Sequence, residues 1–289
     1  DLLAERRAEK VAYWNNEAAP QARLYRLVLA MSVPQHNRTQ VAPLIDPLIG
    51  GMFIGITRSP GGSASGCRPP APICAPFSAA SAALVEEVAR QLRGVDALFT
   101  FSSLYVAVDC RAKMHVDQCN VGASYQLAVG PHEGGVLVKF PPRGHPAGWP
   151  ANVWNKTDGS RPHLCMPFVG KRVSLIAYTH DASLAPESCA QRLAACKLGL
   201  PLPSDSVATS ALAAYRAEPQ ADRCLLSAQV ALKDLCEAIE VTAREYSADD
   251  VIQAAPSSTS ADASHHFGTS AAQVHVARVP TAIIQLLVL

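Results

Sequence analysis

The feature that most restricts the fold of this chain is a block of short β-type runs between residues 98 and 179. The runs are rich in β-branched and aromatic residues, and clusters of Gly, Pro and Asn separate them. The clearest predicted strands cover Phe99–Val108, Ser124–Val129, Val136–Phe140 and Arg172–Thr179. Many short strands with turn residues between them favour a compact β unit, either a sandwich or a barrel.

An amphipathic helix is predicted directly before this block, over Ser78–Arg93, because apolar residues recur there at helical spacing. The predicted strands and this helix together indicate a mainly β core with flanking helices. The overall fold class expected is therefore α+β. Other expected elements are a loop over residues 58–79, helices over Ser188–Leu198 and Leu225–Arg244, and a disordered Ser/Ala-rich stretch over Pro256–Ser270.

Three regions follow from these patterns: a flanking region 1–77, a core 78–185 and a helical, partly disordered region 186–289. A fragment of residues 78–185 is expected to hold the functional site, unless the flanking region completes the core. Met52–Ile56 is the candidate for that completion, because it has the composition of a short buried strand that could pair with a sheet edge.

Composition excludes several classes of protein. Hydrophobic residues make up 49% and charged residues 17%, so the chain can bury a core and is not disordered throughout. The net charge of +1 does not indicate a basic nucleic-acid-coating protein. No apolar run reaches the roughly 18–20 residues of a membrane helix, so no membrane partner is expected. Nine cysteines without a CxxC pair suggest reduced thiols, and hence a cytoplasmic or nuclear protein.

A short motif in the middle of the β block indicates a metal site. In His115-Val116-Asp117, residues i and i+2 of a strand share a face, so an imidazole and a carboxylate can reach one ion. His163 lies 48 residues downstream, far enough for strands to run across and return. Two histidines and one carboxylate form a triad that leaves coordination positions open on iron. The metal ligands predicted are therefore His115, Asp117 and His163.

A second pair with the same spacing follows nine residues after His163. Arg172 and Ser174 again share one face of a predicted strand. A guanidinium binds a carboxylate with two parallel hydrogen bonds, and a neighbouring hydroxyl adds a third. A 2-oxo acid with a distal carboxylate would suit such a pair beside an iron site.

At this point the chain resembles the iron(II)/2-oxoglutarate-dependent oxygenases, whose signature HxD…H…RxS is present in order as His115, Asp117, His163, Arg172 and Ser174. The resemblance covers roughly residues 80–185. The pattern HxDxxN, with Gly122-Ala123-Ser124 and Gly134-Gly135 after it, is similar to the Tet/JBP-like branch, which oxidises methylated nucleobases.

This resemblance implies a double-stranded β-helix, or jelly roll, and a dioxygenase that uses Fe(II), 2-oxoglutarate and O₂ and releases succinate and CO₂. The primary substrate stays open between a nucleobase, a protein side chain and a small molecule, and the low charge does not favour a nucleic acid. The alternative is a non-catalytic, degenerate β-helix binding module of a larger or mobile-element-derived protein.

Four further residues near the motif have weaker assignments. Tyr105 either donates a hydrogen bond to the 2-oxoglutarate carboxylate or is a core aromatic. Asn120 either orients the metal site and touches substrate or forms a turn. Cys119 and Cys165 lie close to metal ligands in the sequence and are expected to point away from the ligand face.

Overall fold

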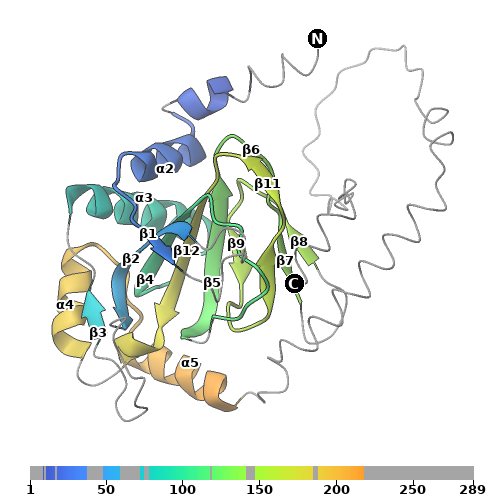
Figure 1. Cartoon of the computed structure of the whole chain (residues 1–289). Coiled ribbons are helices and arrows are strands. Elements are labelled where there is room, and N and C mark those ends of the chain that lie inside the picture. The colour runs from blue at the N-terminus through green and yellow to red at the C-terminus, as the bar shows by residue number, and fades with distance from the viewer. Residues whose placement is uncertain are drawn as a thin grey trace, which may run out of the picture. The chain divides into compact units, whose positions relative to one another are not determined.

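The structure is a computed structural model of the whole chain, shown in Figure 1. It describes residues 9, 11–16, 18–37, 48–58, 72–74, 78–117, 119–140, 147–184 and 188–217. All of them belong to a compact unit, Asp1–Leu225, and a second unit, Leu226–Leu289, lies outside the described residues. The predicted helix over Leu225–Arg244 and the stretch Pro256–Ser270 also lie outside them.

The described part of the chain contains antiparallel strands with helices before and after them. The helices are α2 Pro20–Leu29, α3 Ala79–Val95, α4 Cys189–Lys197, α5 Asp205–Ala217 and the 3₁₀ turn η1 Asp181–Leu184. The strands are β1 Gln35–Asn37, β2 Leu48–Arg58, β3 Pro72–Cys74, β4 Ser103–Val108, β5 Asn120–Val129, β6 His132–Gly134, β7 Leu137–Lys139, β8 Ala147–Trp149, β9 Asn155–Thr157, β10 His163–Cys165, β11 Phe168–Gly170 and β12 Val173–His180.

The strands form one large antiparallel sheet and two small ones. The large sheet has the order β1-β2-β4-β12-β5-β9, with β3 also paired to β2, and the small sheets are β10-β7-β8 and β11-β6. The last strand in sequence, β12, therefore lies between β4 and β5. It pairs antiparallel with both strands, and this pairing defines their register relative to each other. The architecture is mixed α/β with antiparallel sheets, and closure as a jelly roll stays a prediction.

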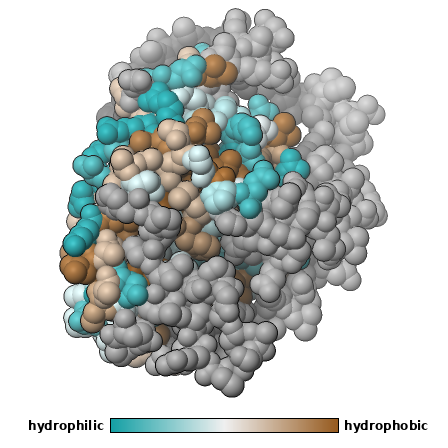
Figure 2. Space-filling model, turned by 60° about the vertical axis from the view of Figure 1, so that its left-hand side comes forward, coloured by the Kyte–Doolittle hydropathy of each residue, from teal (hydrophilic) through white to brown (hydrophobic). Residues whose placement is uncertain are grey.

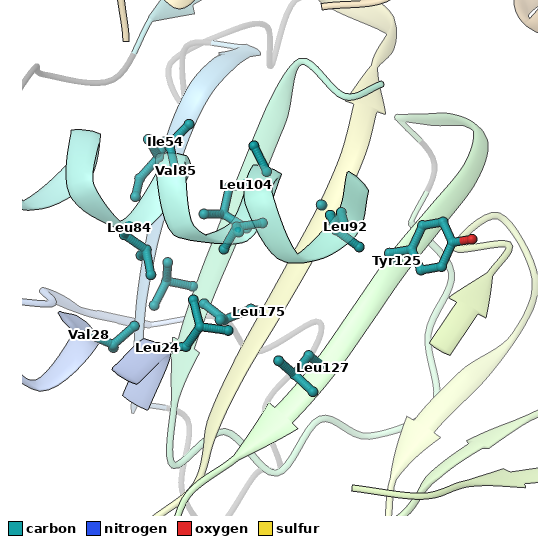
Figure 3. Packing of buried hydrophobic residues seen from close by; sticks show 14 of the residues in the cluster. Leu24, Val28, Ile54, Leu84, Val85, Leu92, Leu104, Tyr125, Leu127 and Leu175 are labelled. Atoms are coloured by element: carbon teal, nitrogen blue, oxygen red, sulfur yellow. The ribbon is translucent and has the colours of Figure 1, made fainter. Parts of the chain in front are cut away.

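Helices α2 and α3 cover one face of the large sheet. Leu84, Val85 and Leu92 of α3 point toward strand side chains in Figure 3, and all three are almost fully buried. Ser78 caps this helix by accepting a hydrogen bond from the Ser81 N–H, which confirms the predicted start of the helix. The apolar stripe predicted from the sequence is thus the face that packs on the sheet.

Alternation along β12 separates the core from the opposite face of the sheet. Val173, Leu175 and Ala177 are buried in the hydrophobic cluster beneath the helices. Arg172, immediately before the strand, and Ser174 line a pocket together with other residues of the same parity. Side chains at i and i+2 share a face, so one strand contributes to both the core and the site.

The flanking region 1–77 contributes an interior strand to the large sheet. Strand β2 includes the predicted strand Met52–Ile56, which is thereby confirmed, and it pairs with β4 over six residues. Ile54 and Ile56 are fully buried against the helices. The prediction of a loop over residues 58–79 is wrong for Pro72–Cys74, which forms the short strand β3 and pairs with the end of β2.

We expect a fragment of residues 78–185 to aggregate and a fragment of residues 18–217 to remain soluble. The shorter fragment lacks β2, so it exposes the β4 edge and the apolar surface that β2 covers. Size-exclusion chromatography and circular dichroism of the two fragments check this. A monomeric, cooperatively unfolding 78–185 fragment would show that β2 is dispensable.

Two further observations concern the outer parts of the unit. Helix α4 confirms the helix predicted over Ser188–Leu198, whereas α5 was not anticipated from the sequence.

Exposed apolar side chains come from separate elements, and Figure 2 shows brown residues lying among teal ones on the face in view. Among the described residues, no helix is long and apolar enough to cross a membrane.

Candidate metal centre

The two histidines of the predicted triad lie opposite one another on a single backbone bridge. The His115 N–H donates to the His163 carbonyl and the His163 N–H donates to the His115 carbonyl, both at 3.0 Å. The bridge places the residues preceding β5 next to β10, although 48 positions separate them in the sequence. The two ring centroids are consequently 4.3 Å apart.

Each ring is held in the same tautomer by a carbonyl two residues earlier. Nδ1 of His115 lies 2.7 Å from the Lys113 carbonyl oxygen, and Nδ1 of His163 lies 2.8 Å from that of Arg161. A carbonyl oxygen only accepts hydrogen bonds, so each Nδ1 carries the proton and each Nε2 carries a lone pair. This is the orientation by which backbone groups prepare histidines for a metal.

The third member, Asp117, has one carboxylate oxygen directed at each imidazole. Its Oδ1 lies 3.7 Å from Nε2 of His115, and its Oδ2 lies 3.8 Å from Nε2 of His163. Both Nε2 atoms therefore face the carboxylate. All three ligand atoms lie within 4.8 Å of one another, so the three side chains are placed to share one metal ion.

Burial keeps His163 uncharged. Its side chain is 8% exposed, and burial, followed by the neighbouring His115, lowers its pKa well below the ordinary value. A metal binds the neutral imidazole, so no proton has to be displaced at neutral pH. Asn120 donates from Nδ2 to Oδ2 of Asp117 at 3.2 Å and so holds the carboxylate in place.

Arg172 and Ser174 lie together on the pocket face. Arg172 is 2% exposed. Its guanidinium carbon lies 5.4 Å from the centre of the Phe168 ring, and its Nη1 donates to Ser174 Oγ at 2.5 Å. Its Nε is buried without a partner, and within the described part of the chain no carboxylate forms an ion pair with it. A buried guanidinium without an anion is costly, so this position favours an anionic ligand.

The backbone of Arg172 is fixed at the end of β4. Asp109 Oδ1 accepts the Arg172 N–H at 2.9 Å, and the Asp109 N–H donates to the Arg172 carbonyl at 2.8 Å. Asp109 adopts a left-handed backbone conformation, with φ of 53°, which aspartate tolerates better than most residues. The side chain of Arg172 therefore enters the pocket from a rigid point.

Two glycines leave room for site residues. A Cβ on Gly135 would lie 2.9 Å from Nε of Arg172, and Gly135 also has a positive φ of 74°. A Cβ on Gly159 would lie 2.7 Å from Nδ2 of Asn120 and 3.1 Å from Oδ2 of Asp117. Both contacts are too close for an alanine without a shift of the site side chain, so these glycines belong to the site although their own side chains do no chemistry.

Tyr105 lies on β4 and lines the pocket, and its side chain contacts the neighbouring strand β2. Its ring lies 4.6 Å from that of Phe53 on β2, and a Cβ on Gly51 would come within 2.4 Å of its hydroxyl oxygen. The hydroxyl is thus held in a space that Gly51 provides. Its location in the pocket is compatible with the predicted contact to a carboxylate ligand, which stays a prediction.

All seven residues that the sequence assigned to the site line one pocket of about 570 Å³. They are His115, Asp117, Asn120, His163, Arg172, Ser174 and Tyr105. Further lining residues, Phe53, Gln126, Ile176, Tyr178 and His180, were not assigned to a site from the sequence. Period-2 alternation from Arg172 could have identified the last three, whereas Phe53 depends on the pairing of β2 with β4.

The expectation for two cysteines is wrong. Cys119 and Cys165 both line the pocket instead of pointing away from it. Cys165 lies two positions after His163 in β10, so alternation places the two side chains on the same face. Cys119 precedes β5 in a turn, where strand alternation does not apply.

Lys139 is an unexpected charged group next to this centre. It pairs with His163 across β7 and β10 and is 8% exposed, and burial lowers its pKa to about 8, against weaker opposing effects from Asp158 and Asp117. Its ammonium group has no ion pair or hydrogen bond among the described residues.

We expect Lys139→Met to stabilise the metal-free protein at pH 7, by up to about 3 kcal/mol, since one pKa unit corresponds to about 1.4 kcal/mol. The folded pKa lies below the unfolded value of about 10.5, so wild-type stability rises between pH 8 and pH 10.5 as the folded state loses the proton first. The variant should lack this rise. Urea unfolding at pH 7 and pH 9.5 measures both effects, and equal stabilities at pH 7 would contradict the burial of a charged lysine.

Comparison with known proteins gives little further information. No protein-family model and no curated protein matches the chain. Among solved structures, it is similar to an oxidoreductase of the 2OG-Fe(II) oxygenase family from Burkholderia pseudomallei, with 15% sequence identity over 54% of this chain and 76% of that chain and a TM-score of 0.40. The sequence identity and the TM-score are both too low to assign an activity. An assignment therefore has to be argued from the geometry of the site.

Proposed function

We propose that this protein is an Fe(II)- and 2-oxoglutarate-dependent dioxygenase that hydroxylates a primary substrate. The observation that carries the proposal is the grouping of His115, Asp117 and His163, whose ligand atoms lie within 4.8 Å of one another while both Nδ1 atoms are turned to backbone carbonyls. The buried, anion-free guanidinium of Arg172 in the same pocket supports a carboxylate-bearing cosubstrate.

The residues present fit this cofactor. His115, Asp117 and His163 would hold the iron, since two imidazoles and one carboxylate leave open positions on it. Fe(II) with 2-oxoglutarate and O₂ supplies an oxidative decarboxylation to succinate and CO₂ that is coupled to hydroxylation of a C–H bond. We also propose, from the resemblance, that the sheets close into a jelly roll and that its metal-binding and cosubstrate-binding residues all come from residues 78–185, whereas β2 completes the sheet and part of the pocket wall.

The side chains around the centre have separate roles in this proposal. Arg172 and Ser174 bind the distal carboxylate of 2-oxoglutarate, and Tyr105 is a further donor to it. Asn120 holds Asp117 in position through the hydrogen bond of 3.2 Å. The backbone carbonyls of Lys113 and Arg161 keep the protons of both imidazoles on Nδ1.

The remaining wall of the pocket is available to the primary substrate. It contains Phe53, Gln126 and Tyr178, so both aromatic contacts and hydrogen bonds are possible. The resemblance of HxDxxN to the Tet/JBP-like branch keeps a methylated nucleobase among the substrate classes, next to protein side chains and small molecules. The net charge of +1 offers no general attraction to nucleic acid.

A two-step experiment tests the proposal. Anaerobic addition of Fe(II) and 2-oxoglutarate to the full chain should give a weak visible charge-transfer band, and admission of O₂ should then release succinate even without the primary substrate. The alternative, a non-catalytic binding module, predicts neither signal. Absence of the band with correctly folded protein would overturn the dioxygenase proposal in favour of that module.

A further inference from the structure

A second group of potential metal ligands lies where β12 ends. Strand β12 ends at His180, which pairs with Asn120 at the start of β5. The next residue, Asp181, donates its backbone N–H to the Cys119 carbonyl at 2.9 Å. The end of one strand and the start of its neighbour therefore bring a thiol, an imidazole and a carboxylate together.

The three side chains offer one ligand atom each within a small volume. A thiol sulfur, an imidazole nitrogen and a carboxylate oxygen of Cys119, His180 and Asp181 all lie within 4.8 Å of one another. Tetrahedral zinc with sulfur at about 2.3 Å and nitrogen or oxygen at about 2.1 Å separates its ligand atoms by roughly 3.4–3.6 Å. Small side-chain rotations would bring these atoms to that spacing.

The imidazole of His180 is fixed and has conflicting neighbours. Nδ1 lies 3.0 Å from the Ala182 N–H, which donates to it, and 2.9 Å from Oδ1 of Asp181. One ring nitrogen cannot both accept the first hydrogen bond and donate the second. If it accepts, an anionic oxygen faces a nitrogen that has no proton for it, and a nearby cation would relieve the repulsion. If it donates to Asp181, the carboxylate orients the imidazole and does not share an ion with it. The first arrangement is therefore the one in which all three side chains are ligands.

The backbone around His180 keeps the ring in place. The His180 N–H donates to Ser102 Oγ at 2.9 Å, and its carbonyl accepts from Ser183 Oγ at 2.7 Å. The side chain is only 6% exposed, yet it lines the same pocket as Cys119. The imidazole of His180 and the thiol of Cys119 are thus two potential metal ligands that an ion can reach from the pocket.

We propose that Cys119, His180 and Asp181 form a second metal site, selective for zinc-type divalent ions and separate from the centre at His115, Asp117 and His163. A thiolate with an imidazole and a carboxylate suits Zn²⁺ or Co²⁺ and disfavours Mg²⁺ or Ca²⁺. Three protein ligands leave one position open toward the pocket. Asn120 lies between the two sites, because it pairs with His180 and its amide donates to Asp117.

Cobalt titration of the full, reduced, metal-free chain tests the proposal. A near-ultraviolet thiolate-to-cobalt band should appear in the wild type and in His115→Ala, and it should be lost in Cys119→Ser. Cys189→Ser is the matched control, because Cys189 is an exposed cysteine that does not line the pocket, and it should keep the band. A band that survives Cys119→Ser overturns the site.

Alkylation of the unmodified chain gives a second measurement that does not depend on a folded variant. Bound Zn²⁺ should slow the modification of Cys119 at least tenfold and leave that of Cys189 unchanged. Equal rates at Cys119 with and without Zn²⁺ would overturn the proposal. Protection that disappears in His115→Ala would also overturn it, since the ion would then lie at the first centre. The band of Fe(II) with 2-oxoglutarate tests the first centre separately.

Discussion

Alanine in place of His115 or Asp117 should abolish the visible band that Fe(II) forms with 2-oxoglutarate and should eliminate succinate release. Each variant removes one of three protein ligands and leaves the other lone pairs without a shared cation. Removing a group that only hydrogen-bonds to a metal ligand lowers metal affinity about 10–100-fold. Removing the ligand itself should therefore lower the affinity for iron by more than about a hundredfold. Anaerobic titration monitored by absorbance measures this loss.

His132→Ala is the matched control for this experiment. His132 is also a buried histidine, on β6, but it does not line the pocket, so the variant should form the band with wild-type amplitude. Circular dichroism of all three variants separates a lost ligand from a lost fold. A band of full amplitude in folded His115→Ala or Asp117→Ala would exclude the metal assignment.

Arg172→Ala should weaken 2-oxoglutarate binding by a hundredfold or more while iron still binds. Removal of one partner of a buried charge pair costs about 3–5 kcal/mol, and about 1.4 kcal/mol corresponds to a tenfold change. Arg172→Lys should recover only part of the affinity, because an ammonium group cannot form the bidentate contact. The dependence of the charge-transfer band on 2-oxoglutarate concentration gives each affinity.

Arg111 provides a closely matched control. Its guanidinium lies 5.3 Å from the centre of the same Phe168 ring that Arg172 contacts, but Arg111 does not line the pocket. Arg111→Ala should therefore leave the affinity for 2-oxoglutarate within about twofold of the wild type. Gly135→Ala should lower that affinity, because the added Cβ displaces Arg172. Unchanged 2-oxoglutarate affinity in Arg172→Ala would mean that the carboxylate binds elsewhere.

Local sequence patterns were sufficient for the elements that contain their own periodicity. The apolar spacing in α3 and the capping Ser78 predicted that helix, and alternation in Arg172–Thr179 predicted β12 and the side on which Arg172 and Ser174 lie. The interval between Asp117 and His163 indicated a shared site without defining its geometry. The helix and the alternation of β12 depend on neighbours within a few residues, so the sequence alone contains them.

Tertiary structure decided what depends on contacts between distant residues. The bridge between His115 and His163, the room that Gly135 leaves for Arg172 and the insertion of β2 beside β4 all follow from strand register, which is set by the packing of the whole sheet. The same holds for Cys119, which was expected to point away from the ligand face and instead lines the pocket. The sequence by itself thus determined which chemical groups are present and on which face of a strand they lie, whereas only the pairing of β12 between β4 and β5 decided which of them meet.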